Sequence, residues 1–229
     1  KVELKKQDGK LKALISPHAG YVYSAPVAAY SYHELKRRGV NKVILRGTSH
    51  YEYYKGIACS SSKYWEDHFL KEDIELLSCK NGDVLVRNDK PFKEEHSVEV
   101  QMPFLVSVVK DLKLMVLITG EVEDHVRAAY ELNREMDEHT VLVISSDLSH
   151  YHDYETAGKM DKKTIDQIIS LEGNVNSEQA CGFNGINILI ELARVNGWVP
   201  RLLNYRNSGD TAGGKSQVVG YCAIGFYSK

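Results

Sequence analysis

The sequence of 229 residues has few cysteines and no CxxC pair. The cysteines, Cys59, Cys79, Cys181 and Cys222, are far apart along the chain. Their spacing excludes a zinc ribbon and a thioredoxin-type redox motif. In a reducing cytosol we expect all four side chains to be thiols.

The sequence also lacks long apolar runs and an excess of charge of one sign. No apolar stretch approaches the roughly 20 residues that a membrane-spanning helix needs, and no signal-peptide core is found. We therefore expect a cytoplasmic protein without a membrane partner. The formal net charge is -2 and the basic residues are dispersed, which predicts no nucleic-acid partner. Strand-like sequence begins almost directly after Lys1, so we expect a further segment upstream.

Short β-branched runs alternate with helical patterns along the chain. Runs typical of strands lie at Lys12–Ser16, Lys42–Arg46, Lys113–Thr119, Thr140–Ser145, Arg201–Tyr205 and Gln217–Phe226. Helical patterns lie at Ala25–Arg38, Val98–Asp111, Glu155–Leu171 and Ile186–Asn196. In the second of these, Pro103 predicts either a kink or a helix that begins near Met102.

This alternation predicts an α/β fold of three layers in one domain over residues 1–229. Its central sheet is largely parallel or mixed, with helices on both faces. The parallel part is indicated by strands that are apolar throughout rather than alternating. The last run follows a glycine-rich turn and is expected to form one arm of a hairpin.

Three histidines each follow the end of a strand-like run by a few residues. His18 lies in PHAGY, His50 in TSHY and His150 in DLSHY. Loops that leave the carboxyl ends of neighbouring parallel strands converge on one crevice. One such histidine alone is more often satisfied by local backbone groups, but three in one crevice suit metal binding or acid–base catalysis. A tyrosine follows each of them closely, and these tyrosines are expected to line the mouth of the crevice or to fill the core.

Other polar residues near these motifs have two interpretations each. Asp147 precedes His150 at a spacing that fits one helical turn, so it either caps a helix or orients His150 or a metal-bound histidine. Cys181 lies shortly before the helix predicted at Ile186, where a thiolate is favoured as a metal ligand or reactive group. The carboxylates of Glu94 and Glu95 precede His96 ahead of a helix, whose dipole alone favours carboxylates there, so Glu94 and His96 either reach the crevice or only cap this helix.

One motif match is rejected on its context. Residues Gly209–Ser216 fit the phosphate-binding pattern GxxxxGK[ST]. That loop binds phosphate because a helix follows it and offers N–H groups. Here a strand-like run follows, and only 13 residues remain after Ser216. We therefore interpret this segment as a hairpin loop and expect no nucleotide cofactor.

Taken together, these motifs make the sequence similar to the Memo family. The matching blocks are PHAGYVYS (17–24), GTSH (47–50), EEHSVEVQMPFL (94–105), SSDLSHY (145–151), ACG (180–182), SGD (208–210) and VVGY (218–221). They span nearly the whole chain in a specific order. The family in turn resembles the class III extradiol dioxygenases in fold.

The resemblance implies a pocket in which His18, His50 and Cys181 bind a metal, with Asp147 and His150 beside it. The position of His150 is that of the acid–base residue in the dioxygenases, which hold iron(II) with two histidines and a glutamate. A thiolate in place of that carboxylate favours copper, zinc or a differently poised iron. We therefore expect iron(II) or copper, with zinc as a further option.

Two functions from different classes stay open. One is metal-dependent redox or dioxygenase-like chemistry on a small molecule, in which His150 exchanges protons with the bound ligand. The other is a non-enzymatic scaffold that binds a metal or a peptide in the same pocket, because members of the family are linked to phosphotyrosine peptides and to copper or iron handling. The sequence leaves the substrate and the oligomeric state open.

Overall fold

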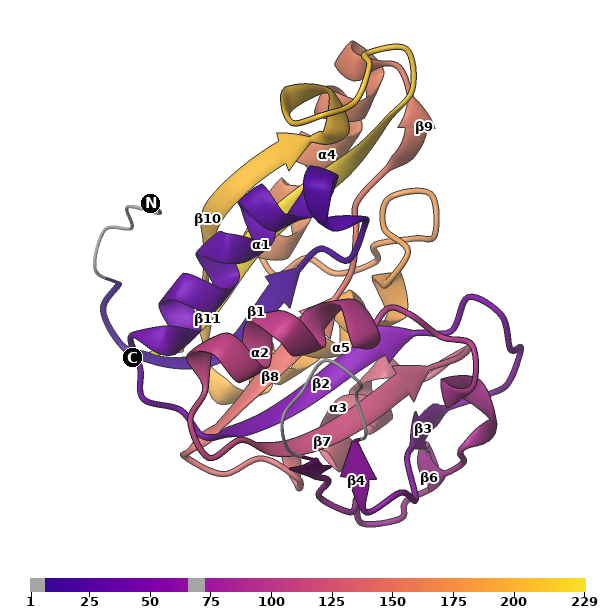
Figure 1. Ribbon diagram of the computed structural model, residues 1–229, viewed down its shortest axis with the longest axis vertical. Helices are drawn as coiled ribbons and strands as arrows, with labels where there is room; N and C mark the ends of the chain where they lie inside the picture. The colour runs from indigo at the N-terminus through magenta and orange to yellow at the C-terminus, as the bar shows by residue number, and fades with distance from the viewer. Residues whose placement is uncertain (1–6, 66–72) are drawn as a thin grey trace.

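A mixed β-sheet runs through the centre of the molecule and has helices on both faces (Figure 1). The structure is a computed structural model and describes residues 7–65 and 73–229. The main strands of the sheet are β1 (Lys10–Ser16), β2 (Lys42–Thr48), β7 (Lys113–Thr119), β8 (Thr140–Ser145), β10 (Val199–Asn207) and β11 (Val218–Ser228). Shorter strands of this sheet are β3 (Ile57–Cys59), β6 (Leu85–Arg87) and β9 (His150–His152), while β4 (Tyr64–Trp65) and β5 (Ile74–Glu75) form a separate two-stranded sheet. The α/β class predicted from the sequence is confirmed.

The strand order places the loops of the candidate motifs side by side. Along the described sheet it is β10-β11-β1-β8-β2-β7-β3-β6, and β9 pairs with β11. Strands β1, β8, β2 and β7 are mutually parallel, whereas β11 runs antiparallel to β1 and β10. The register aligns Ser16 with Ser145 and Arg46 with Ile144. The carboxyl ends of β1, β8 and β2 are therefore level neighbours.

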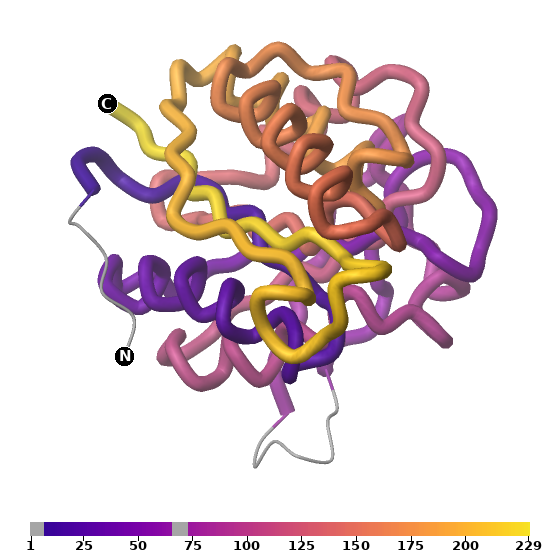
Figure 2. The backbone as a smooth tube through the Cα atoms, turned by 90° about the horizontal axis from the view of Figure 1, so that it is seen from above, coloured from indigo at the N-terminus to yellow at the C-terminus, as the bar shows by residue number. Residues whose placement is uncertain are grey.

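The helices form one layer on each side of the sheet. They are α1 (Tyr21–Lys36), α2 (Met102–Val108), α3 (His125–Asn133), α4 (Tyr154–Ile169) and α5 (Phe183–Asn196). In Figure 1, α1 and α2 lie in front of the sheet while α3 and α5 lie behind it. Figure 2 shows α1 and α4 on opposite sides of the β10–β11 hairpin.

The buried side chains alternate between these two layers, as the pleat of a strand requires. On β8, Leu142 and Ile144 pack with residues of α3, α4 and α5, while Val141 and Val143 pack with α1 and α2. A sheet buried on both faces explains why the central strands are apolar throughout. The predicted parallel core with two helical layers is thus observed.

Most helix and strand predictions agree with the structure within a few residues. A 3-10 turn at Glu99–Gln101 precedes α2, which begins at Met102 with Pro103 in its first turn, so the second interpretation of that proline is confirmed. A strand, β11, follows the glycine-rich segment 209–216 and forms the expected hairpin with β10. Two further 3-10 turns lie at Lys90–Phe92 and Ser208–Asp210.

Other elements differ from the predictions. The prediction of a helical turn between Asp147 and His150 is wrong, because residues 146–149 are irregular and His150 begins β9. Helix α1 begins at Tyr21, four residues before the predicted start. Helix α3 and the short strands β3 to β6 were not predicted.

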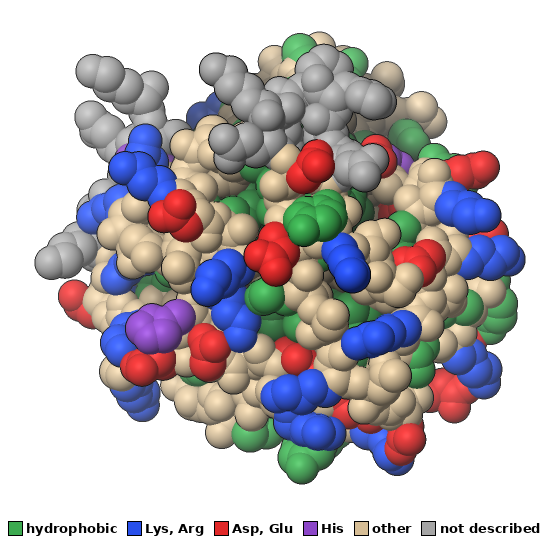
Figure 3. Space-filling view, turned by 60° about the horizontal axis from the view of Figure 1, so that its bottom comes forward, with side chains coloured by type: hydrophobic (Ala, Val, Ile, Leu, Met, Phe, Trp, Pro, Cys, Tyr) green, Lys and Arg blue, Asp and Glu red, His purple; other side chains and the backbone are tan. Residues whose placement is uncertain are grey.

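Within the described residues, no helix is long and apolar enough to cross a membrane. Figure 3 shows acidic and basic side chains interspersed on one face of the molecule. This pattern agrees with the small net charge of the sequence.

Candidate metal centre

The carboxyl ends of β1, β8 and β2 border a pocket of about 650 Å³. Its lining includes the five residues that the sequence proposed as metal ligands or acid–base residues: His18, His50, Asp147, His150 and Cys181. It also contains His96, Tyr151 and Ser177. The topology therefore brings together side chains that are up to 163 residues apart in the sequence.

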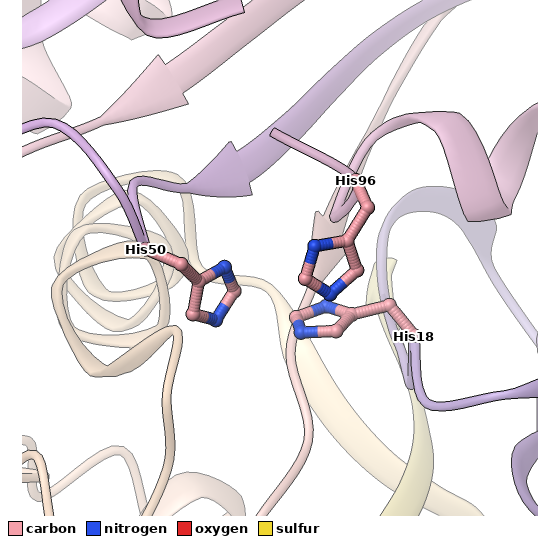
Figure 4. A group of neighbouring side chains, drawn as sticks. All are labelled: His18, His50 and His96. Carbon is pink, nitrogen blue, oxygen red and sulfur yellow. The ribbon is translucent and has the colours of Figure 1, made fainter. Parts of the chain in front are cut away.

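Three imidazoles converge in this pocket (Figure 4). His18 follows β1, His50 follows β2, and His96 precedes the 3-10 turn before α2. One ring nitrogen of each lies within 4.8 Å of the others. The rings of His50 and His96 are stacked at 5.2 Å between centroids, and the His18 ring stands edge-on to both. Such a group is able to hold a metal ion.

Cys181 reaches the same point from the opposite helical layer. It lies two residues before α5, and its Sγ is 3.5 Å from Nε2 of His18. The backbone N–H of Asp147 donates to this sulfur at 3.3 Å. The carbonyl of Cys181 accepts a bond from the Thr48 hydroxyl at 3.2 Å, which ties its loop to the end of β2.

His18 is held by residues at the end of β8. It is 4% exposed, and its Nδ1 lies 2.9 Å from the Ser145 hydroxyl. Its backbone N–H donates to Oδ1 of Asp147 at 2.8 Å, and the N–H of Ala19 donates to the same oxygen at 3.3 Å. The Asp147 carboxylate thereby fixes the turn that presents the His18 ring.

His50 is held by Glu95, one of the two carboxylates that precede His96 in the sequence. Oε1 of Glu95 accepts from Nδ1 of His50 at 2.9 Å, and Oε2 accepts from the His50 backbone N–H at 2.7 Å. Oε1 also accepts from the N–H of Ser97 at 2.8 Å. Because a carboxylate only accepts, Nδ1 of His50 is protonated and Nε2 faces the pocket.

The pocket stabilises a thiolate next to protonated imidazoles. Burial opposes ionisation of Cys181, but the adjacent His18 and His50 lower its pKa to about 6. Burial likewise opposes the charge on His18, but Cys181 and Asp147 raise its pKa to about 9. Hydrogen bonds to Cys181 and Glu95 raise the pKa of His50 to about 10. A metal ion that binds a thiol or an imidazole must displace the proton at the ligating atom.

The structure decides between the two interpretations of Glu94 and His96. His96 lines the pocket, and its partial burial lowers its pKa, which favours the neutral form that binds metals. Glu94 is exposed and does not line the pocket. The adjacent Glu95 is the buried carboxylate of this segment.

Asp147 and His150 are close in the sequence, but their side chains have no described contact with each other and hold different positions in the pocket. The described hydrogen bonds of the Asp147 carboxylate go to the backbone of His18 and Ala19, and none joins it to the ring of His150. Asp147 therefore neither caps a helix nor hydrogen-bonds His150. His150 lines the pocket from β9, which is held against β11 through Val219.

The tyrosines near the three histidines are exposed rather than core residues. Tyr21, Tyr51 and Tyr151 are 47%, 61% and 71% exposed. The Tyr51 ring lies 6.4 Å from the His50 ring, and the Tyr151 ring lies 5.8 Å from that of His150. Tyr151 lines the pocket and has a φ of 61°, an uncommon value for a non-glycine residue, whereas Tyr21 and Tyr51 are not among the lining residues.

Comparisons with known proteins agree on one relationship. A family model described as "Memo-like protein" matches residues 1–225. A "MEMO1 family protein" of Desulfurococcus amylolyticus is 32% identical, over 93% of this chain and 82% of the relative. One from Nitrosopumilus maritimus is 31% identical, over 93% of this chain and 83% of the relative.

A solved structure supports the fold. An uncharacterised protein from Escherichia coli K12 matches 94% of this chain and 99% of its own, with a TM-score of 0.54. Its sequence identity to this chain is 11%, so the likeness extends to the fold alone.

Proposed function

This chain belongs to the Memo family, and from that premise we propose that His18, His50 and Cys181 bind a transition-metal ion that serves redox or dioxygenase-like chemistry on a small molecule. The pocket around these residues would hold the substrate. We propose iron(II) or copper as the ion, with zinc as a further option, because imidazole and thiolate donors suit all three.

The distance between Cys181 and His18 supports this proposal best. Two ligands on one tetrahedral ion, with metal–sulfur and metal–nitrogen bonds of about 2.3 and 2.0 Å, are separated by roughly 3.5 Å. Sγ of Cys181 and Nε2 of His18 are 3.5 Å apart. Little movement is therefore needed for these two atoms to share an ion.

His96 is the competing third ligand. Its ring nitrogen lies within 4.8 Å of those of His18 and His50, so the three histidines form a second possible ligand set. Its side chain is 45% exposed, whereas Cys181 has a lowered pKa and a donated N–H to its sulfur. We therefore assign Cys181 to the ion and His96 to the side from which a ligand enters.

The residues of the pocket would divide the chemistry between them. A bound metal supplies Lewis-acid or redox capacity. His150 faces the same pocket from β9 and would exchange protons with the bound ligand. Asp147 would act on this chemistry indirectly, by fixing the turn of His18.

The test is metal content per chain, measured by plasma mass spectrometry on protein purified anaerobically without affinity metals. We expect about one iron or copper per chain, lost in His18→Ala and Cys181→Ala and retained in His96→Ala. Cys222→Ala and His139→Ala are the matched controls, because neither residue lines the pocket. Metal that is unaffected by Cys181→Ala but lost in His96→Ala would replace the thiolate with the third histidine.

A second function is favoured by the exposed Tyr21, Tyr51 and Tyr151 near the pocket. Exposed aromatic rings are typical of binding surfaces, so a non-enzymatic scaffold for peptides is the alternative. Single-turnover oxygen consumption with a panel of catechols distinguishes the two. Oxygen uptake that requires His150 supports the enzyme. No uptake by metal-loaded protein, together with peptide binding that is lost when the three tyrosines become alanine, supports the scaffold.

A further inference from the structure

We propose that Ser145 and Gln101 are positioning residues that keep the Nδ1 atom of His18 protonated and so direct its Nε2 atom to the metal. This inference rests on the proposed metal function.

The Ser145 hydroxyl has a full set of partners. Its Oγ lies 2.6 Å from the carbonyl oxygen of Ser97, 2.8 Å from Nε2 of Gln101 and 2.9 Å from Nδ1 of His18. A hydroxyl has one proton and two lone pairs. The carbonyl of Ser97 can only accept, so the hydroxyl of Ser145 donates its one hydrogen bond to it. Ser145 must then accept from the other two groups, and Nδ1 of His18 must donate.

The orientation of Gln101 supports the same assignment. Its Nε2 also lies 2.9 Å from the carbonyl oxygen of Pro17, which can only accept, so this atom is the amide nitrogen. Its Oε1 accepts from the Tyr32 hydroxyl at 2.6 Å. Gln101 is fully buried and Tyr32 is 2% exposed, so water does not compete for these bonds. Each donor and acceptor in the network thus has one consistent role.

The consequence is that both strand-end histidines present the same nitrogen to the pocket. Glu95 fixes the Nδ1 proton of His50, and the Ser145 hydroxyl fixes that of His18. The partner of His50 is a carboxylate, whereas that of His18 is a neutral hydroxyl. Such outer hydrogen bonds orient the ring of a metal-ligating histidine and select its tautomer.

The direct test is ¹H–¹⁵N NMR of the histidine side chains in the metal-free protein at pH 7. We expect a slowly exchanging proton on Nδ1 of His18, because both the charged ring and the assigned neutral tautomer carry one there. Ser145→Ala should abolish its protection from exchange. Ser149→Ala is the matched control, because this buried serine lies in the same segment and its hydroxyl interacts with Asp161 rather than with His18. A wild-type His18 ring without an Nδ1 proton would overturn the proposal whether or not the variants fold.

The second measurement is the zinc dissociation constant of the same proteins. Loss of an outer hydrogen bond to a ligating histidine typically weakens metal binding roughly 10-fold to 100-fold, and we expect this for Ser145→Ala but not for Ser149→Ala. Equal zinc affinity in folded Ser145→Ala and wild type would refute the positioning role. The expected NMR signal in a wild-type protein that binds no zinc would refute the metal function, and the positioning role with it, while the hydrogen-bond assignment stands.

Discussion

Replacement of Glu95 by glutamine should lower both the stability of the fold and the affinity for a metal. Glu95 is 1% exposed and accepts three hydrogen bonds, two from His50 and one from Ser97. Glutamine has nearly the same size but offers only one acceptor oxygen. One side of its amide therefore points N–H groups at a donor, whichever way the amide is turned.

The expected loss of stability follows from the hydrogen-bond donor that the glutamine leaves without an acceptor. If the glutamine oxygen takes the position of Oε1, the backbone N–H of His50 faces an NH₂ group and loses its acceptor. A buried donor without a partner costs about 1–3 kcal/mol. If the amide is turned the other way, the Nδ1 proton of His50 is no longer favoured and the ring presents the wrong nitrogen. We then expect metal affinity to fall by roughly 10-fold to 100-fold.

The stability difference should depend on pH in a defined direction. Burial alone would raise the pKa of Glu95, but bonds from His50 and Ser97 lower it from 4.5 to about 2. A depressed carboxyl pKa stabilises the fold fully above pH 4.5, and this stabilisation is lost as the pH falls towards 2. The shift corresponds to about 3 kcal/mol at neutral pH. Glutamine does not titrate, so the gap between wild type and variant should narrow below pH 4.5.

The assay is urea unfolding of both proteins at pH 7 and at pH 3, with a zinc titration at pH 7. Glu94→Gln is the matched control. The Glu94 carboxylate is exposed, so this substitution should leave stability and zinc affinity unchanged. Equal stability of Glu95→Gln and wild type at pH 7 would refute the argument. A stability gap that is the same at both pH values would refute the link to ionisation.

Three further results are expected. Asp147→Ala removes the acceptor of the His18 backbone N–H and should lower the free energy of unfolding by about 1–3 kcal/mol, and unchanged unfolding in urea would contradict this. Gly220→Ala places a methyl group against the carboxylate of Asp161 and should cost about 1–3 kcal/mol in thermal unfolding, whereas Gly214→Ala, which meets no neighbour, should not. Binding of a divalent ion at pH 7 should release about two protons, measured by calorimetry in buffers of different ionisation enthalpy, and release of none would contradict the assigned imidazole protons.

The fold was predictable where local pattern and tertiary packing agree. The apolar strands β7 and β8 match their predicted bounds, because a strand buried on both faces needs apolar residues at every position. The short strand β9 was missed. Its three residues are half-exposed or exposed, and their pairing with β11 is a long-range contact without a local signature.

The site was predictable where chemistry coincides with a strand end. His18, His50 and His150 follow strands that topology makes neighbours or near neighbours, so their meeting in one pocket follows from the fold class. Glu95 and Gln101 were not predicted, because they lie between β6 and α2 and reach the site only through three-dimensional packing. A carboxylate directly before His96 was the one local signal, and it also fits the first turn of a helix.

The charge of the pocket helps to decide which ion it suits. The Cys181 thiolate and the carboxylates of Glu95 and Asp147 are close together, and in the metal-free protein the protons of His18 and His50 offset part of their charge. A divalent ion that displaces two protons leaves the charge of this buried region unchanged. Copper(I) would displace the same protons and leave the region more negative, which costs free energy in a low-dielectric site. Thiolate softness favours copper(I), whereas charge balance favours iron(II), copper(II) or zinc. We therefore expect copper(I) to bind with retention of one imidazole proton, so that it releases fewer protons than a divalent ion does.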